Sequence, residues 1–163
     1  MKRGRQMRTG KARRQSGFSL IELVIVVVII GIIAAIAIPR LSRGSAGAAD
    51  SSVSANLAVL RNAIDLFAAE HGGTYPTAAA FTAQLTQYTD STGASATTKD
   101  ATHIYGPYLR SVPPLPVGAN KGGVGVAAAT ATGVGWLYVE TTGVITANTT
   151  TEADASGKLY NTY

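Results

Sequence analysis

Residues 18–38 form an almost unbroken apolar run, FSLIELVIVVVIIGIIAAIAI, in which only Ser19 and Glu22 are polar. About 20 apolar residues are enough to cross the hydrocarbon core of a bilayer as an α-helix. Val and Ile dominate the run and would favour a strand in water. In lipid a single segment must satisfy its own backbone hydrogen bonds, so a helix is expected instead. The run therefore predicts a hydrophobic transmembrane helix over residues 18–39.

The positive charge of the chain is concentrated ahead of this run. Residues 1–17 hold seven of the 14 basic residues and no acidic residue. The rest of the chain has seven basic residues against nine acidic ones, a net charge of −2. A basic flank favours the cytoplasmic side of a membrane. Because a nucleic-acid-binding protein carries a basic patch on its folded domain, we expect no nucleic acid as a partner of this chain.

A second pattern follows Pro39, which removes one helix hydrogen bond. Apolar residues recur at spacings of four, three, four and three, which places them on one face of a helix. The helix is expected to end at Gly72–Gly73. We therefore predict residues 40–71 as the amphipathic half of the same long helix, and residues 72–163 as a C-terminal globular region. The apolar stripe consists of Val53, Leu57, Leu60, Ile64 and Phe67.

The C-terminal region carries strand signals. Residues 134–139 (VGWLYV) and 144–147 (VITA) flank a short polar turn and predict a β-hairpin, to which residues 124–128 add a further strand. The expected fold class is α+β. A long N-terminal α-helix, made of a membrane stem and an amphipathic half, packs on a small antiparallel β-sheet.

Glu22 is the residue of the apolar run that most needs an explanation. A charge at the centre of a membrane helix costs about 2.5–3.5 kcal/mol, less near an end, and usually marks function. Residues 18–39 contain no basic side chain that could pair with it. A cut before Phe18 would create an α-amino group, which is charged at neutral pH. In a staggered parallel bundle this amine could meet the Glu22 of a neighbouring subunit and set the register, so we predict that Glu22 acts in assembly.

These residues also resemble a known signal. A basic leader over residues 1–17, Gly17, Phe18, Glu22 and then unbroken aliphatic residues are similar to the class III signal sequence of type IV pilins and type II secretion pseudopilins. The resemblance implies a type IV pilin-like prepilin. It implies that a prepilin peptidase cuts between Gly17 and Phe18 and N-methylates Phe18. In filaments of this family the helix loosens between a glycine and a proline, here Gly31 and Pro39.

The same resemblance implies a location and partners. The subunit would cross the bacterial inner membrane once, with the leader cytoplasmic and the C-terminal region outside. It would then join identical subunits in a periplasmic pseudopilus or a surface pilus, aided by an inner-membrane assembly platform and by minor pilins or pseudopilins. Lipid tails are as apolar as the stem, so extraction from the membrane needs an external motor. The chain is expected to be a structural subunit and not an enzyme.

Two features favour a secretion pseudopilin over a surface pilin. Tyr75–Pro76 and residues 106–109 (GPYL) resemble the major pseudopilin of type II secretion, and the chain has no cysteine, whereas many type IV pilins close a C-terminal loop with a disulfide. We therefore expect a role in type II protein secretion. A type IV pilin for adhesion, motility or DNA uptake is the alternative.

The major pseudopilins usually bind calcium near the C-terminus. Calcium prefers six to eight oxygen ligands, several of them carboxylate, and the two acidic residues here are few. No cofactor is therefore expected, although calcium stays open as a candidate, and no residue is assigned to a metal. The residues that could contribute are Asn148, Glu152, Asp154 and Ser156.

Other interpretations of the N-terminus stay open. An ordinary secretory signal could use Ala35–Ile36–Ala37 as its small-x-small site, but the apolar run exceeds the usual 7–15 residues and Glu22 would be unexplained. A membrane-anchored protein of other function, including an enzyme with an uncleaved anchor, explains the length of the run. It explains neither Glu22 nor the Gly17–Phe18 junction.

Overall fold

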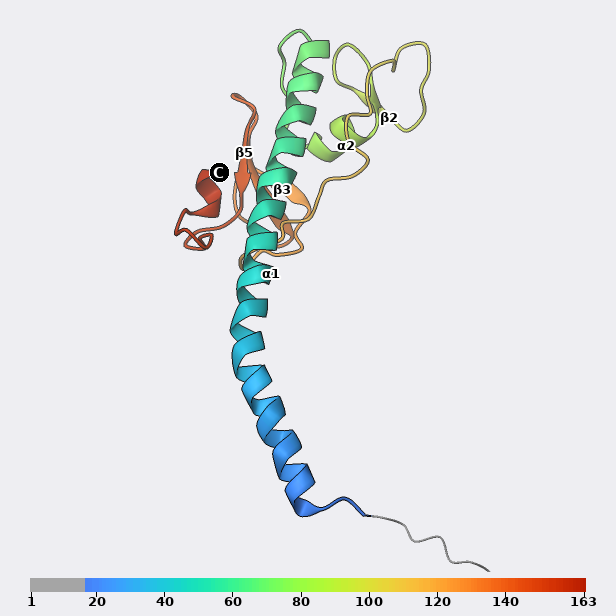
Figure 1. Ribbon diagram of the computed structural model, residues 1–163. Coiled ribbons are helices and arrows are strands. Elements are labelled where there is room, and N and C mark those ends of the chain that lie inside the picture. The colour runs from blue at the N-terminus through green and yellow to red at the C-terminus, as the bar shows by residue number, and fades with distance from the viewer. Residues whose placement is uncertain (1–16) are drawn as a thin grey trace, which may run out of the picture. The chain divides into compact units, whose positions relative to one another are not determined.

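The computed structural model describes residues 17–163, and for residues 39–46 it describes the backbone only. Apart from Gly17, the leader predicted over residues 1–17 lies outside the described part. Two helices, five strands and a final 3₁₀ helix follow one another in this part (Figure 1). Their bounds are α1 Leu20–Glu70, α2 Phe81–Thr86, β1 Tyr88–Thr89, β2 Ser95–Ala96, β3 Gly125–Ala127, β4 Val134–Val139, β5 Val144–Ala147 and η1 Tyr160–Thr162. The chain divides into two compact units between residues 40 and 41.

The first unit contains the apolar part of α1. Leu20–Ile38 is long and apolar enough to cross a membrane, and none of its side chains is buried. The exposure of its large apolar side chains runs from 45% at Val24 to 81% at Leu20. Such a surface cannot stay in contact with water, since burying apolar area is worth about 25 cal/mol per Å². The segment therefore needs lipid or other apolar chains around it.

The second unit has its own hydrophobic core, built on the remaining part of α1. All five residues of the predicted stripe are at most 1% exposed, which confirms the helical spacing. Against them pack Phe81 and Leu85 of α2, the β4 residues Trp136 and Tyr138, and Ile145 of β5. On the opposite face of α1, Val59 and Leu66 stay about half exposed. The core therefore lies entirely within the second unit.

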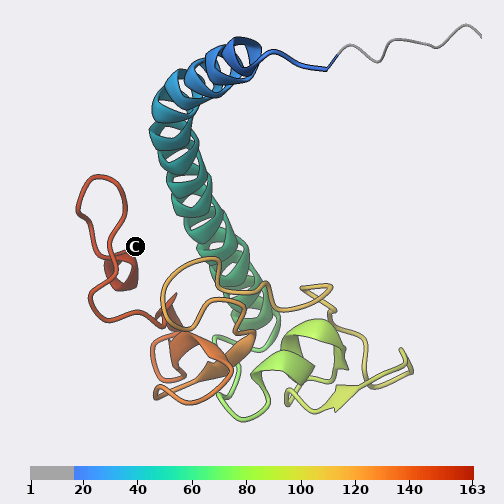
Figure 2. The same ribbon diagram turned by 90° about the horizontal axis from the view of Figure 1, so that it is seen from below.

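The elements of this unit lie on two sides of α1. Figures 1 and 2 show α2 with β2 on one side, and β5 with the C-terminal segment on the other. Polar groups of the core aromatics are also satisfied. Trp136 Nε1 donates a hydrogen bond to the Pro113 carbonyl at 2.8 Å, and the Tyr138 hydroxyl donates to the Pro76 carbonyl at 2.9 Å. These two bonds tie the loops to the sheet.

The α+β class is confirmed, and β4 and β5 form the predicted antiparallel hairpin, with Trp136 opposite Ala147 and Val139 opposite Val144. The sheet as a whole is mixed, which corrects the expectation of a purely antiparallel one. Strand β3 pairs with β4 in parallel, and a separate two-stranded antiparallel sheet joins β1 and β2.

The parallel pair is possible because β3 is short. Three residues rise about 10 Å, a distance that the loop of residues 128–133 can retrace without a helical crossover. The backbones also come unusually close here. A Cβ placed on Gly135 would lie 2.1 Å from the Gly123 carbonyl oxygen, so only glycine fits at the start of β4.

Candidate functional site

The predicted cleavage site lies in exposed, non-helical chain. Gly17, Phe18 and Ser19 have no regular secondary structure and precede the first turn of α1. Phe18 is 89% exposed, and a Cβ placed on Gly17 would meet no atom within 4 Å. The described chain thus has no steric need of its own for glycine at position 17. A requirement for glycine there would have to come from another protein that binds this segment.

Glu22 lies in the first turn of α1, where its Oε2 accepts a hydrogen bond from the Ser19 backbone N–H at 2.9 Å. Ser19 occupies the N-cap position and Glu22 the third helical position, so this contact is the carboxylate half of a capping box. A negative charge in the first turn also interacts favourably with the helix dipole. The Ser-x-x-Glu spacing is visible in the sequence, yet sequence reasoning missed this role.

The capping contact does not neutralise the carboxylate. A backbone N–H is a donor without a net charge, and Glu22 faces no basic side chain within residues 17–38. Hydrolysis of the Gly17–Phe18 bond would turn the Phe18 nitrogen into an ammonium group, adjacent in the chain to the Ser19 N–H that Glu22 accepts. Both ions would then lie at the same end of α1. Among residues 17–38, a positive partner for this carboxylate, on its own chain or on a neighbour, would arise only by such a cleavage.

Gly31 and Pro39 both lie inside α1, which is assigned as continuous helix from Leu20 to Glu70. A Cβ on Gly31 would meet nothing within 4 Å, so packing in the described chain does not demand glycine there. Glycine and proline are nevertheless the residues that most weaken a helix interior. The loosening implied for filaments stays a prediction.

The residues considered for calcium are bonded to the chain itself. Asn148 is buried, and its side chain donates to the Val134 carbonyl at 2.7 Å and accepts from the Thr130 hydroxyl at 2.8 Å. Glu152 and Asp154 accept from backbone N–H groups of their own loops. Within residues 17–163 no three His, Cys, Asp or Glu side chains gather in a way that could hold a metal ion.

Four carboxyl groups of the second unit are stabilised in their charged form. Hydrogen bonds from backbone N–H groups, chiefly that of Ala119, lower the pKa of Glu152 to about 2. The Ser156 hydroxyl, and then that of Tyr163, hold the pKa of Asp154 well below its ordinary value. The pKa of Asp90 is lowered chiefly by the Thr92 hydroxyl.

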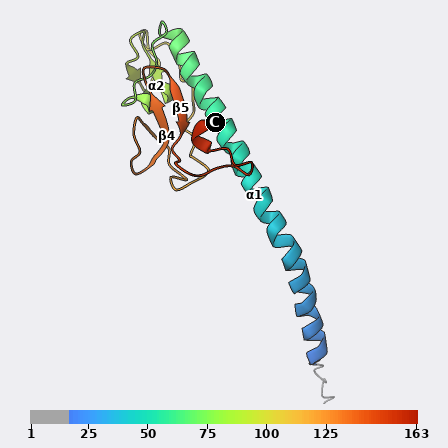
Figure 3. The ribbon, with the colours of Figure 1, turned by 90° about the vertical axis from the view of Figure 1, so that its left-hand side faces the viewer.

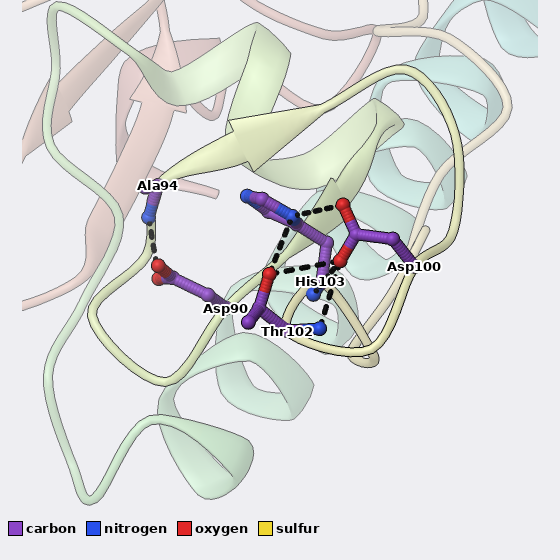
Figure 4. Close-up of polar contacts among 5 residues, drawn as sticks. All are labelled: Asp90, Ala94, Asp100, Thr102 and His103. Carbon is purple, nitrogen blue, oxygen red and sulfur yellow. Dashed lines mark hydrogen bonds and ion pairs between the residues drawn. The ribbon is translucent and has the colours of Figure 1, made fainter.

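The fourth carboxyl group, Asp100, closes an exposed loop (Figure 4). Its Oδ1 accepts from the backbone N–H groups of His103 and Thr102, and these bonds lower its pKa strongly. Its Oδ2 lies 2.8 Å from His103 Nδ1, and the Thr102 hydroxyl lies 3.1 Å from the same nitrogen. A catalytic triad needs the acid and the nucleophile on opposite ring nitrogens. The cluster therefore serves as a loop closure and lacks the geometry of a hydrolase site.

These carboxyl groups predict a loss of stability in acid. A carboxyl group whose pKa is lowered by folding contributes its full stabilisation above its pKa in the unfolded chain, about 4. This contribution disappears as the pH falls through the lower pKa of the folded chain. We expect the thermal midpoint of the full chain in detergent to be steady from neutral pH to about pH 5, and then to fall towards about pH 2. Fluorescence of Trp136, the single tryptophan, reports it. A midpoint independent of pH over this range would contradict the assignment.

The N-terminal part of the chain matches a known family model. Residues 12–38 match a family model described as the prokaryotic N-terminal methylation motif. The matched segment contains the Gly17–Phe18 junction, Glu22 and Gly31, and it ends directly before Pro39. No curated protein and no solved structure matches the chain.

Proposed function

We propose that this chain, a type IV pilin-like prepilin by its N-terminal methylation motif, is the structural subunit of a type II secretion pseudopilus. The observation that carries the proposal is the arrangement at the N-terminus. An exposed Gly17–Phe18 bond precedes a 19-residue apolar helix whose first turn contains Glu22. Cleavage at that bond would remove seven positive charges and create the one cation that Glu22 lacks.

The proposed maturation has two chemical steps. A prepilin peptidase hydrolyses the Gly17–Phe18 amide with one water molecule and leaves a carboxylate on the leader and an ammonium on Phe18. The Phe18 nitrogen would then lose a proton and attack the methyl carbon of a sulfonium methyl donor, whose carbon–sulfur bond breaks. The methylated nitrogen remains basic and positively charged. Removal of the leader also removes the polar segment that would keep the end of α1 at the cytoplasmic surface. The mature subunit would wait as a single-pass protein of the inner membrane with its C-terminal region outside.

Assembly would then bury the exposed stem. The large apolar side chains of residues 20–38 stay exposed among the described residues, and a bundle of identical stems would cover them. Transfer from lipid to such a bundle gains little, because both surroundings are apolar. We therefore expect an assembly platform with a motor to extract the subunit. Pairing of Glu22 with a Phe18 amine would select one stagger of the helices.

The secretion role is supported by features of the second unit. The chain has no cysteine. The segments that resemble the major pseudopilin make specific contacts. The Tyr108 hydroxyl donates to Glu70 at the end of α1, the Leu109 N–H donates to the Leu85 carbonyl, and the Pro76 carbonyl accepts from Tyr138. These contacts hold the loops after α1 and α2 in place. The residues that resemble the major pseudopilin therefore have a structural role in this chain.

The test is to determine the N-terminus of the chain from its native host. Mass spectrometry should find a chain that begins at Phe18 and carries one additional methyl group, and electron microscopy should find filaments that contain it. Deletion of the gene should trap secreted enzymes in the periplasm. Loss of surface pili or motility with normal secretion would favour the type IV pilin. A chain that begins at Ile38 would overturn the proposal, as would one that keeps its leader.

A further inference from the structure

The C-terminal segment of the chain is tied back to α1 by polar contacts. The Tyr160 hydroxyl donates to Asp50 Oδ1 at 2.5 Å, and the Ala155 N–H donates to Asp50 Oδ2 at 3.3 Å. The Arg61 guanidinium donates to the main-chain carbonyl of Tyr163 and, at 3.3 Å, to that of Ile145. Figure 3 shows the C-terminus beside this part of α1. Both oxygens of Asp50 are thus occupied by residues more than 100 positions away.

A second carboxylate completes this connection. Asp154 Oδ1 accepts from the Ser156 N–H at 2.8 Å, from the Ser156 hydroxyl at 2.7 Å and from the Lys158 N–H at 2.9 Å. Its Oδ2 accepts from the Tyr163 hydroxyl. The Lys158 ammonium lies 4.2 Å from the centre of the Tyr163 ring, within the range of a cation–π contact. We call Asp50, Arg61, Asp154, Tyr160 and Tyr163 the C-terminal clasp.

Glu152, the third acidic residue of this region, lies outside the clasp, and both of its oxygens accept hydrogen bonds. Glu152 Oε1 accepts from the Ala119 N–H at 2.9 Å, and Oε2 accepts from the Thr150 and Thr151 N–H groups at 2.9 and 3.1 Å. The side chain of Asn148 points to Val134 and Thr130, as described above. The oxygens of Asp50, Glu152 and Asp154 therefore all accept hydrogen bonds from other groups of the chain. The donors to these three residues come from different segments.

The oxygen atoms of these residues do not form a site that fits a calcium ion. Calcium prefers six to eight oxygens that converge on one point, whereas these oxygens already accept from N–H and O–H groups. Among the described residues, the buried side-chain oxygens that lack a hydrogen-bond partner are Thr149 Oγ1 and Asn161 Oδ1. Both are neutral, so neither brings the negative charge that carboxylate ligands give to a calcium site. A bound cation would have to compete with these donors for the same carboxylate oxygens.

We infer that the C-terminal segment closes on α1 through the C-terminal clasp and that the second unit folds without a bound calcium ion. The clasp does what an ion would otherwise do, because it supplies hydrogen-bond donors to the oxygens of Asp50 and Asp154 and ties residues 154–163 to the rest of the unit. Both tyrosines stay protonated donors well above neutral pH. The hydrogen bonds to Asp50 and Asp154 raise the pKa values of Tyr160 and Tyr163 to about 12. The inference holds for either kind of filament.

The direct test measures thermal unfolding of the full chain in detergent by the fluorescence of Trp136, which is fully buried in the second unit. We expect the midpoint in millimolar calcium chloride to agree to within about 1 °C with that in excess EDTA. Magnesium chloride at the same concentration controls for ionic strength. A calcium ion present at about 100 times its dissociation constant would raise the midpoint by about 5 °C or more, and a rise of that size specific to calcium would overturn the inference.

A pair of variants tests the clasp itself. Tyr160→Phe removes the hydroxyl that reaches Asp50 and keeps the ring, and we expect it to lower the midpoint by about 5 °C, equally with calcium and with EDTA. Tyr88→Phe is the matched control. It removes the hydroxyl of a half-buried tyrosine on β1 and should leave the midpoint within about 1 °C. Equal midpoints for Tyr160→Phe and the unmodified chain would overturn the role of the clasp.

Discussion

Glu22→Ala is expected to leave cleavage between Gly17 and Phe18 intact and to reduce filament yield about 100-fold or more. An ammonium group buried among apolar stems without a countercharge costs about 3–5 kcal/mol, and each 1.4 kcal/mol is about a factor of ten in an equilibrium. The peptidase meets the bond before assembly, so the processed fraction should not change. Filaments sheared from cells would be quantified by immunoblot and electron microscopy, and intact mass would report processing.

A matched variant separates the charge of Glu22 from its capping contact. Glu22→Gln keeps an oxygen that can accept from the Ser19 N–H, so it retains the contact that caps α1 but loses the negative charge. We expect this variant to fail in assembly as Glu22→Ala does. If Glu22→Gln forms filaments at the normal level, capping and not charge is what assembly needs. Normal filaments from Glu22→Ala would remove both explanations.

Gly17→Trp is expected to lower the processed fraction of the chain at least about tenfold. A Cβ at this position meets no atom within 4 Å in the described chain, so the substitution should leave the fold unchanged. The expected block arises in the peptidase, which must accommodate residue 17 next to the bond that it hydrolyses. The uncleaved chain would keep its basic leader and lack the Phe18 ammonium, so it should form no filaments. Intact mass of the membrane fraction measures the block.

Gly17→Ala is the control, since a methyl group is small enough that we expect cleavage to persist. The pair also distinguishes the competing interpretation of the N-terminus. An ordinary secretory signal would be cut after Ala37, twenty residues downstream, and its processing would not depend on residue 17. Unchanged processing of Gly17→Trp would therefore point away from a prepilin peptidase acting at Gly17.

Several features could be predicted from the sequence because neighbouring residues determine them. The buried stripe from Val53 to Phe67 follows from helical periodicity. The bounds of β4 and β5 follow from two apolar strand-forming segments joined by a tight turn. The methylation motif is itself a contiguous segment, so residues 12–38 could be recognised without a fold. The capping contact of Glu22 is local as well, because the Ser-x-x-Glu spacing that produces it is visible in the sequence.

Contacts between distant residues were decided only by the tertiary structure. No local pattern indicates that β3 would pair in parallel with β4, or that Gly135 would have to pass the Gly123 carbonyl so closely. The same holds for the bond from Tyr160 to Asp50, which joins residues 110 positions apart. Periodicity in the sequence shows which side of a helix or strand is apolar. It does not show which other helix or strand will pack against that side. Sequence alone thus determined the apolar stem, the motif around Gly17 and Phe18, and the buried stripe of α1. Packing decided the mixed sheet and which carboxylates form hydrogen bonds with the C-terminal segment.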